Sequence, residues 1–186
     1  MNTKVILIPG NGGGSPTDNW SPYLEKEIPL QLGISVINTQ FPDALLARKE
    51  FWLPFIKELG ADEDTILIGH SSGAIAAMRY AEENVILGSV LVGAYYTHMN
   101  YEEEKASQYF DTPWNWNAIK KNQQWTILFA STDDPFIPIE EPRHIRDMLG
   151  SVYHEHTDRA HFGHGTFPQT EFPELIEALR LQLISE

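Results

Sequence analysis

The stretch Gly69-His70-Ser71-Ser72-Gly73 constrains the fold more than any other part of the chain. An apolar run with β-strand character, residues 65–68, comes directly before it, and helix-forming residues 74–81 follow. A strand that turns sharply into a helix through Gly-x-Ser-x-Gly is typical of a nucleophile elbow. The glycines relieve the crowding of the turn. The serine lies at the N-terminus of the following helix, where unpaired N–H groups favour negative charge. We therefore predict that Ser71 is a nucleophile.

The rest of the chain alternates between short apolar runs, which are typical of strands, and apolar residues at helical spacing. Apolar runs predict strands at 5–8, 34–38, 87–92, 125–130 and 151–156, besides 65–68. Helical spacing of apolar residues predicts helices from about 18 to 32, 43 to 59, 141 to 149 and 173 to 184, besides the one after the elbow. Such alternation favours right-handed crossovers and a parallel sheet with helices on both faces. A length of 186 residues without a composition break predicts one domain over 1–186.

A glycine-rich loop, residues 9–15, follows the first predicted strand. It lacks the lysine of a P-loop, and Ser15 stands where a dinucleotide-binding loop needs its third glycine. We favour a different role, in which the loop supplies a backbone N–H to an oxyanion hole. Asn11 and Gly12 are the candidates, with the N–H of Asn11 preferred, and Ser72 is expected to supply the second N–H. Gly12 is also a candidate substrate contact, as is His70.

Residues 94–124 interrupt the alternating pattern with many aromatic side chains and the acidic run 102–104. A connection of this length favours a lid or a binding loop, and the alternative is a structural excursion whose aromatic residues fasten it to the body. The sequence does not decide between them. Trp114 from this segment, and Phe136 further along, are predicted substrate contacts. The acidic run, if it lines the mouth of the site, would favour an amine-bearing substrate such as an aminoacyl ester.

Two aspartates follow the strand at 125–130, where the acid that orients a catalytic histidine belongs. Asp134 begins an Asp-x-x-x-Pro spacing that is common after such an acid, so we choose it over Asp133, which is expected to cap a turn. The order Ser, Asp, His places the histidine in the loop after the last strand. His161 lies there, with His164 in reserve. The tract that contains His154, His156, His161 and His164 does not make a convincing metal site, and no metal or other cofactor is expected.

Composition narrows the remaining functional classes. The formal net charge of −13 would repel nucleic acid and anionic membranes, so neither is an expected partner. The absence of cysteine excludes disulfides and thiolate chemistry, and a cytoplasmic location is expected. The N-terminal apolar run is too short for a signal-peptide core. We expect a monomer or weak dimer that acts on a small acyl substrate.

Four motifs give the chain a specific resemblance that covers nearly its whole length. They are Pro9-Gly10-Asn11-Gly12-Gly13-Gly14, Phe51-Trp52-Leu53-Pro54-Phe55, the run from Ile68-Gly69-His70-Ser71 to Tyr80, and Ser131-Thr132-Asp133-Asp134-Pro135-Phe136. With them the chain resembles the small α/β-hydrolases of the retinoblastoma-binding-protein-nine and YdeN-like serine hydrolase family. The resemblance implies a compact six-stranded parallel sheet and a triad of Ser71, Asp134 and His161.

The resemblance has one informative departure. The retinoblastoma-protein-binding motif is Leu-x-Cys-x-Glu, and the matching residues, Leu59-Gly60-Ala61-Asp62-Glu63, lack the cysteine. A pocket-protein partner is therefore not expected. The predicted function is hydrolysis of small ester, thioester or activated amide substrates through an acyl-enzyme. The alternative is a binding or scaffold protein on a hydrolase fold, because fold does not fix function.

Overall fold

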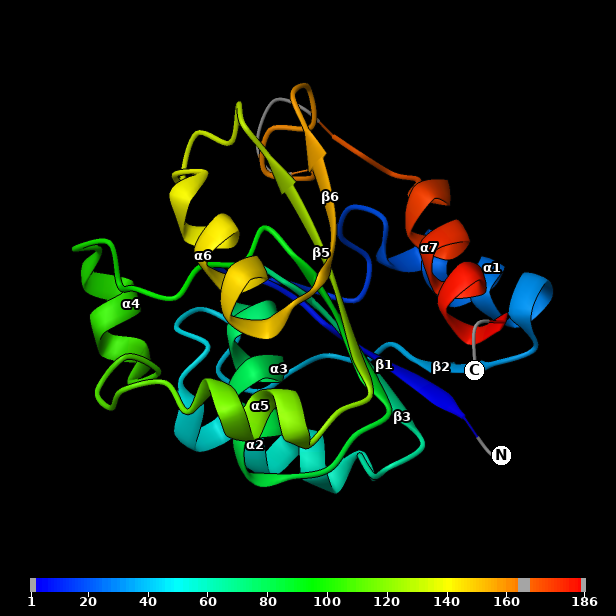
Figure 1. Ribbon diagram of the computed structural model, residues 1–186, viewed down its shortest axis with the longest axis horizontal. Coiled ribbons are helices and arrows are strands. Elements are labelled where there is room, and N and C mark those ends of the chain that lie inside the picture. The colour runs from blue at the N-terminus through cyan, green and yellow to red at the C-terminus, as the bar shows by residue number, and fades with distance from the viewer. Residues whose placement is uncertain (1–2, 164–167, 185–186) are drawn as a thin grey trace.

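A computed structural model describes residues 3–163 and 168–184 and contains a six-stranded sheet in the order β2-β1-β3-β4-β5-β6 (Figure 1). All neighbouring strands pair in parallel. The strands are β1 (Lys4–Ile8), β2 (Ser35–Ile37), β3 (Thr65–His70), β4 (Gly88–Val92), β5 (Trp125–Ser131) and β6 (Val152–His156). The predicted six-stranded parallel sheet is confirmed.

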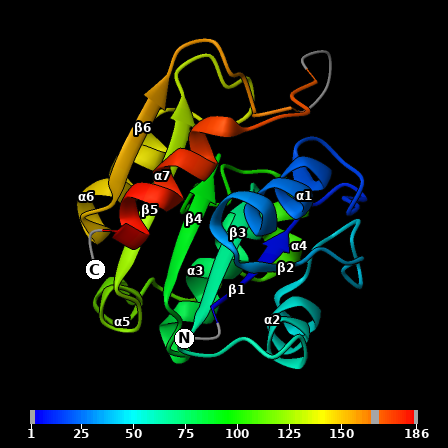
Figure 2. The same cartoon turned by 90° about the vertical axis from the view of Figure 1, so that its right-hand side faces the viewer.

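Helices cover both faces of this sheet, as Figure 2 shows from the side of α1 and α7. The helices are α1 (Ser21–Leu32), α2 (Lys49–Glu58), α3 (Ser72–Glu83), α4 (Glu102–Ser107), α5 (Trp116–Lys121), α6 (Glu140–Leu149) and α7 (Pro173–Ile184). Helices α1 and α7 pack on one face, and α2, α3, α5 and α6 pack on the other. None of the helices in the described ranges is long and apolar enough to cross a membrane.

The alternation of side chains along β1 explains why both faces need a cover. Val5 and Leu7 point into the core beneath α1 and α7, whereas Ile6 and Ile8 point into the core beneath α3. All four are buried, because a parallel sheet with helices on both faces leaves neither side to water. The central strands are accordingly apolar throughout, which is why their positions could be predicted from short apolar runs.

The carboxyl ends of the strands place the site. The chain leaves β1 toward β2 on one side and later adds β3 on the other side of β1, so the strand order reverses between β1 and β3. Loops that leave two such strands diverge and open a crevice, which is the usual ligand position in open α/β sheets. The glycine-rich loop and the Gly-x-Ser-x-Gly turn are the two loops that leave this point.

The start of the second helix differs from the prediction. Helix α2 begins at Lys49, whereas the sequence suggested a start at Asp43. Asp43 has a φ of +48°, and its carboxylate accepts hydrogen bonds from the backbone N–H and the guanidinium of Arg48. Residues 43–47 therefore form a turn that ends where the helix begins. Sequence periodicity could not show this, because the turn depends on a side-chain contact.

Candidate active site

Ser71 lies between β3 and α3 in a strained backbone conformation with a φ of +54°. The flanking glycines explain how the turn is possible. A Cβ on Gly69 would lie 2.3 Å from the backbone of Gly73, and one on Gly73 would lie 2.3 Å from the carbonyl oxygen of Ile8. Neither position tolerates a side chain. A strained residue held by its surroundings is common at functional sites and is the geometry of a nucleophile elbow.

A buried histidine and a buried aspartate meet above the ends of the strands. His161 Nδ1 lies 2.6 Å from Asp134 Oδ2, and the two side chains are 5% and 3% exposed. The other oxygen of Asp134 accepts hydrogen bonds from the N–H groups of Phe136, at 2.9 Å, and Ile137, at 3.1 Å. Asp134 thus has a fixed orientation, and it fixes the ring of His161 in turn.

Asp133 has a different position and a different role. Its Oδ1 accepts hydrogen bonds from the Ser131 hydroxyl and, at 2.9 Å, from the N–H of Ala160. The Ser131 hydroxyl in turn accepts the N–H of Arg159 at 3.1 Å. These bonds tie the end of β5 to the loop that carries His161. The structure therefore pairs His161 with Asp134, while Asp133 organises the loop.

The loop around His161 is held from the N-terminal half of the chain as well. The backbone carbonyl of His161 lies 2.9 Å from His70 Nε2, so this nitrogen carries the proton and donates, because a carbonyl can only accept. The indole N–H of Trp20 donates to the carbonyl of Phe162 at 3.0 Å. Ala160 and Phe162, on either side of His161, both have positive φ. Several contacts thus support a locally strained loop.

Two backbone N–H groups near Ser71 stay available for a ligand. The N–H groups of Gly12 and Gly13 donate to the carbonyls of Leu45, at 2.9 Å, and Ala44, at 3.0 Å. By contrast, no hydrogen bond within the described ranges engages the N–H of Asn11 or of Ser72. Ser72 opens α3, so its N–H has no acceptor within the helix. Of the two donors predicted from the glycine-rich loop, Asn11 is therefore the one left unengaged.

Comparison with known proteins identifies the family. The family model of serine hydrolases matches residues 5–174. The chain belongs to the serine hydrolase family. It is 44% identical over 183 residues to the protein named serine hydrolase RBBP9 of Rattus norvegicus, covering 97% of this chain and 96% of that one. It is 23% identical over 167 residues to the YdeN protein of Bacillus subtilis (strain 168), covering 87% of each chain. The resemblance to these small hydrolases is confirmed.

Solved structures agree on the fold of this serine hydrolase. The crystal structure of the ydeN gene product of B. subtilis superimposes with a TM-score of 0.83 at 23% identity, over 99% of this chain and 100% of that chain. The esterase RhEst1 of Rhodococcus sp. ECU1013 superimposes with a TM-score of 0.64 at 15% identity, over 98% and 90% of the two chains. At these identities the likeness concerns the fold alone, which is that of the α/β-hydrolases.

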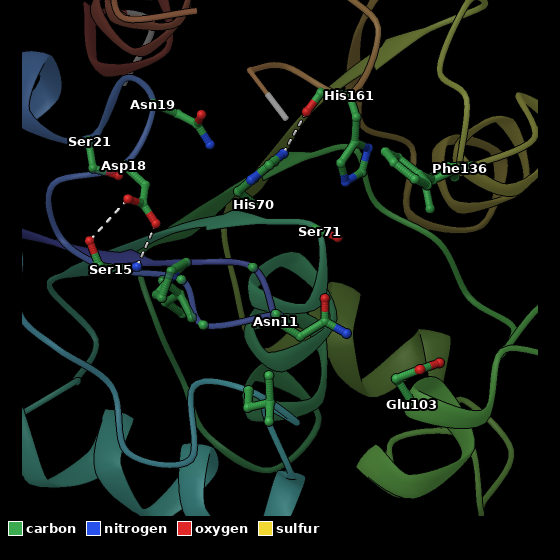
Figure 3. Close-up of a pocket in the computed structure, with 18 of the residues that line it drawn as sticks. Asn11, Ser15, Asp18, Asn19, Ser21, His70, Ser71, Glu103, Phe136 and His161 are labelled. Atoms are coloured by element: carbon green, nitrogen blue, oxygen red, sulfur yellow. Dashed lines mark hydrogen bonds between the residues drawn. The ribbon is translucent and has the colours of Figure 1, made fainter. Parts of the chain in front are cut away.

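The serine hydrolase has a cavity of about 750 Å³ at the strand ends, bordered by Ser71, His161, His70 and Asn11 (Figure 3). Gly12 and Phe136, two further predicted contacts, also line it. The His161 ring lies between those of His70 and Phe136, with centroids 4.8 Å and 5.3 Å away. The structure thus brings together all predicted site residues except Trp114, with Asp134 behind His161 and Ser72 behind Ser71.

Trp114, predicted from the sequence to contact substrate, does not line this cavity. Its indole N–H donates to the carbonyl of Tyr96 at 2.8 Å, and the guanidinium carbon of Arg79 lies 3.6 Å from its ring centroid. The same guanidinium donates to the carbonyls of Tyr109, at 2.8 Å, and Thr112, at 2.7 Å. Trp114 therefore fastens the 94–124 segment to α3. A cluster of aromatic residues in sequence could not reveal that a buried arginine holds it.

The histidines of the last strand also have structural surroundings. His154 and His156 stack on Phe129, with ring centroids 4.6 Å and 6.1 Å away. Burial lowers the pKa of both imidazoles below the usual histidine value. His164, the reserve candidate for the catalytic histidine, lies outside the described residues. In the described ranges, no group of three or more histidine, cysteine or acidic side chains is arranged to hold a metal ion.

The sequence does not distinguish Glu104 from its two acidic neighbours. Its side chain is only 6% exposed and borders the cavity beside Ser71. Its Oε1 accepts a hydrogen bond from the side-chain amide of Asn11 at 2.9 Å. The sequence treats the acidic run 102–104 as one group that could line the mouth of the site. The signal that separates them is helical phase, because Glu104 and Ser107, three residues apart in α4, are both buried.

Proposed function

We propose that this chain hydrolyses small esters, thioesters or activated amides through an acyl-enzyme on Ser71. The observation that carries the proposal is the buried Asp134–His161 pair, whose histidine borders the same cavity as a strained serine. Since Nδ1 of His161 donates to Asp134, Nε2 is the nitrogen that can accept the serine proton. Membership of the serine hydrolase family supports the reaction class.

The proposed reaction has two steps. In the first, the Ser71 hydroxyl attacks the substrate carbonyl while His161 takes its proton, and the oxyanion that forms is bound by the N–H groups of Asn11 and Ser72. The carbon–leaving-group bond then breaks, and His161 protonates the departing alcohol, thiol or amine. In the second step, His161 deprotonates a water that attacks the acyl-enzyme, the acid leaves, and Ser71 recovers its proton.

Labelling with a fluorophosphonate tests the proposal directly. This probe reacts with activated serines, and we expect one adduct per chain on the peptide that contains Ser71. Ser71→Ala should remove the label, and incubation with p-nitrophenyl acetate should release p-nitrophenol and acetate from the wild type only. A folded wild type that neither labels nor releases product would refute the proposal, and the binding-protein alternative would then be the one to pursue.

The charges around the cavity support a preference for neutral or cationic substrates. Asp18, Glu103 and Glu104 line the cavity, while no lysine or arginine of the described residues does. Glu103 is exposed, and it comes from α4 at the edge of the view in Figure 3. A carboxylate there would attract an ammonium group on the substrate. We therefore propose that the substrates include amine-bearing acyl groups, of which aminoacyl esters are the simplest.

Two esters that differ only in an ammonium group test this preference. The p-nitrophenyl esters of alanine and of propionate fit the requirement. Glu103→Gln should lower kcat/KM for the alanine ester by about two- to fivefold, the range expected of one exposed charge pair, and should leave the propionate ester unchanged. Glu102→Gln is the matched control, because Glu102 is 83% exposed, pairs with Lys105 and does not border the cavity. Equal effects on both esters would argue against the ammonium preference.

A further inference from the structure

Glu104 is an unusual residue to find buried beside the candidate site. Burial raises the pKa of its carboxyl above the ordinary value, and the neighbouring Tyr95 hydroxyl and Asn11 amide oppose that rise. Its Oε2 is buried and has no hydrogen-bond partner within the described part of the chain. A buried carboxyl with one unpaired oxygen costs folding free energy, so its presence calls for an explanation. The contact that it does make indicates one.

That contact joins two segments that are 93 residues apart in sequence. Glu104 Oε1 accepts from Asn11 Nδ2 at 2.9 Å, and thereby holds a residue that lines the cavity and is the candidate backbone donor. Gly12 and Gly13 anchor the glycine-rich loop on its other side, through the carbonyls of Leu45 and Ala44. Both glycines have positive φ, and such residues add little stiffness of their own. The side chain of Asn11 therefore adds a second constraint on the position of its own N–H.

The second candidate oxyanion donor is held in the same manner. The hydroxyls of Ser72 and Tyr95 lie 3.0 Å apart, and both are buried. Burial first, and then the neighbouring Glu104 carboxyl, raise the pKa of Tyr95 well above its usual value, so its hydroxyl stays protonated. Tyr95 and Glu104 belong to the same 94–124 segment. That segment therefore holds the side chains of both residues whose N–H groups bind the oxyanion in the proposed reaction.

We infer that Glu104 is a positioning residue for the oxyanion hole, acting through the side chain of Asn11 on the Asn11 backbone N–H. The inference rests on the proposed function. Glu104 accepts a hydrogen bond from the side chain of Asn11, so its effect should appear where the oxyanion forms. Preorganised donors act because they are already in place when charge develops, and a displacement of about 1 Å can cost on the order of 100-fold in rate.

A double-mutant cycle on kcat tests this inference with p-nitrophenyl acetate, a neutral ester without hydrogen-bond donors. Glu104→Leu and Asn11→Ala should each lower kcat by about 10- to 100-fold, which is less than the loss expected when an oxyanion donor is removed outright. KM should change by less than about threefold. The double variant should be no slower than the slower single variant, because both changes break one contact. Glu104→Gln keeps an oxygen acceptor for Asn11 and should stay within about threefold of the wild type.

Further measurements separate positioning from general damage. The inhibition constant of phenylboronic acid, whose tetrahedral serine adduct places an oxygen in the oxyanion hole, should rise in parallel with the loss of kcat. Glu102→Gln should change neither quantity. If Glu104→Leu does not fold, Asn11→Ala and Glu104→Gln still decide the question, since the first must be slow and the second must not. A wild type without turnover would refute the proposed function and this inference together. An active wild type with additive or absent effects would refute this inference alone.

Discussion

Asp134→Asn should lower kcat for p-nitrophenyl acetate by about 10⁴-fold while the fold stays intact. An asparagine oxygen can still accept the N–H groups of Phe136 and Ile137, which Asp134 Oδ1 accepts now. The amide NH₂ would then face His161 Nδ1, where the carboxylate oxygen lies at 2.6 Å. Two donors cannot share that contact, so the imidazole would move its proton to Nε2. In this tautomer Nε2 cannot take the proton of Ser71.

Asp133→Asn is the matched control for this prediction. It removes the same charge one residue earlier, and its amide oxygen can still accept from Ser131 and Ala160. We expect kcat within about threefold of the wild type, because the acceptor geometry survives. Circular dichroism and the melting temperature should match for both variants. A slow Asp133→Asn beside an active Asp134→Asn would reverse the assignment of the two aspartates.

Gly73→Ala should destabilise the protein by at least about 3 kcal/mol. The new methyl group would lie 2.3 Å from the carbonyl oxygen of Ile8 and 2.5 Å from that of Pro9. Neither backbone can retreat, because Ile8 ends β1 and pairs with Gly69 in the adjacent strand. A loss of this size lowers the melting temperature by roughly 6 to 12 °C in a domain of this length. Thermal unfolding followed by circular dichroism measures it.

Gly60→Ala separates this steric effect from the cost of backbone strain. Gly60 has a φ of +82° and open space where a Cβ would stand, and it follows α2 at a distance from the candidate site. The substitution should cost about 1 to 2 kcal/mol, the penalty of a left-handed conformation alone. If Gly73→Ala melts within about 2 °C of Gly60→Ala, then the close packing of the elbow against β1 is not what fixes glycine at position 73.

The sheet could be predicted from the sequence because its signals are local. Each central strand is a short apolar run, and such a run predicts a buried strand without knowledge of its contacts with distant residues. Helix starts were harder to predict when a side chain decided them. The start of α2 depends on the contact between Asp43 and Arg48. Helix α1 begins after Trp20, whose side chain does not cap it, while Asp18 binds the N–H of Ser15.

The candidate site could be predicted only in part, for a related reason. Ser71, Asp134 and His161 are recognisable because their order and their places at strand ends follow from the chemistry they would perform. Trp114 and Glu104 are not, because their environments depend on residues far away in sequence. Arg79 lies 35 positions before Trp114 and covers its ring, and Asn11 lies 93 positions before Glu104 and binds it.

The bond from Trp20 to the carbonyl of Phe162 has a consequence for how the protein is made. It spans 142 positions, and it joins the first loop after β1 to the loop that carries His161. A ribosome delivers the N-terminal partner long before the C-terminal one, and domains fold as units during synthesis. Every nascent chain that ends before His161 therefore lacks both the proposed general base and the hydrogen bond that holds its loop. The proposed hydrolysis should begin only after the loop around His161 has left the exit tunnel, so that the onset of activity reports the arrival of that loop.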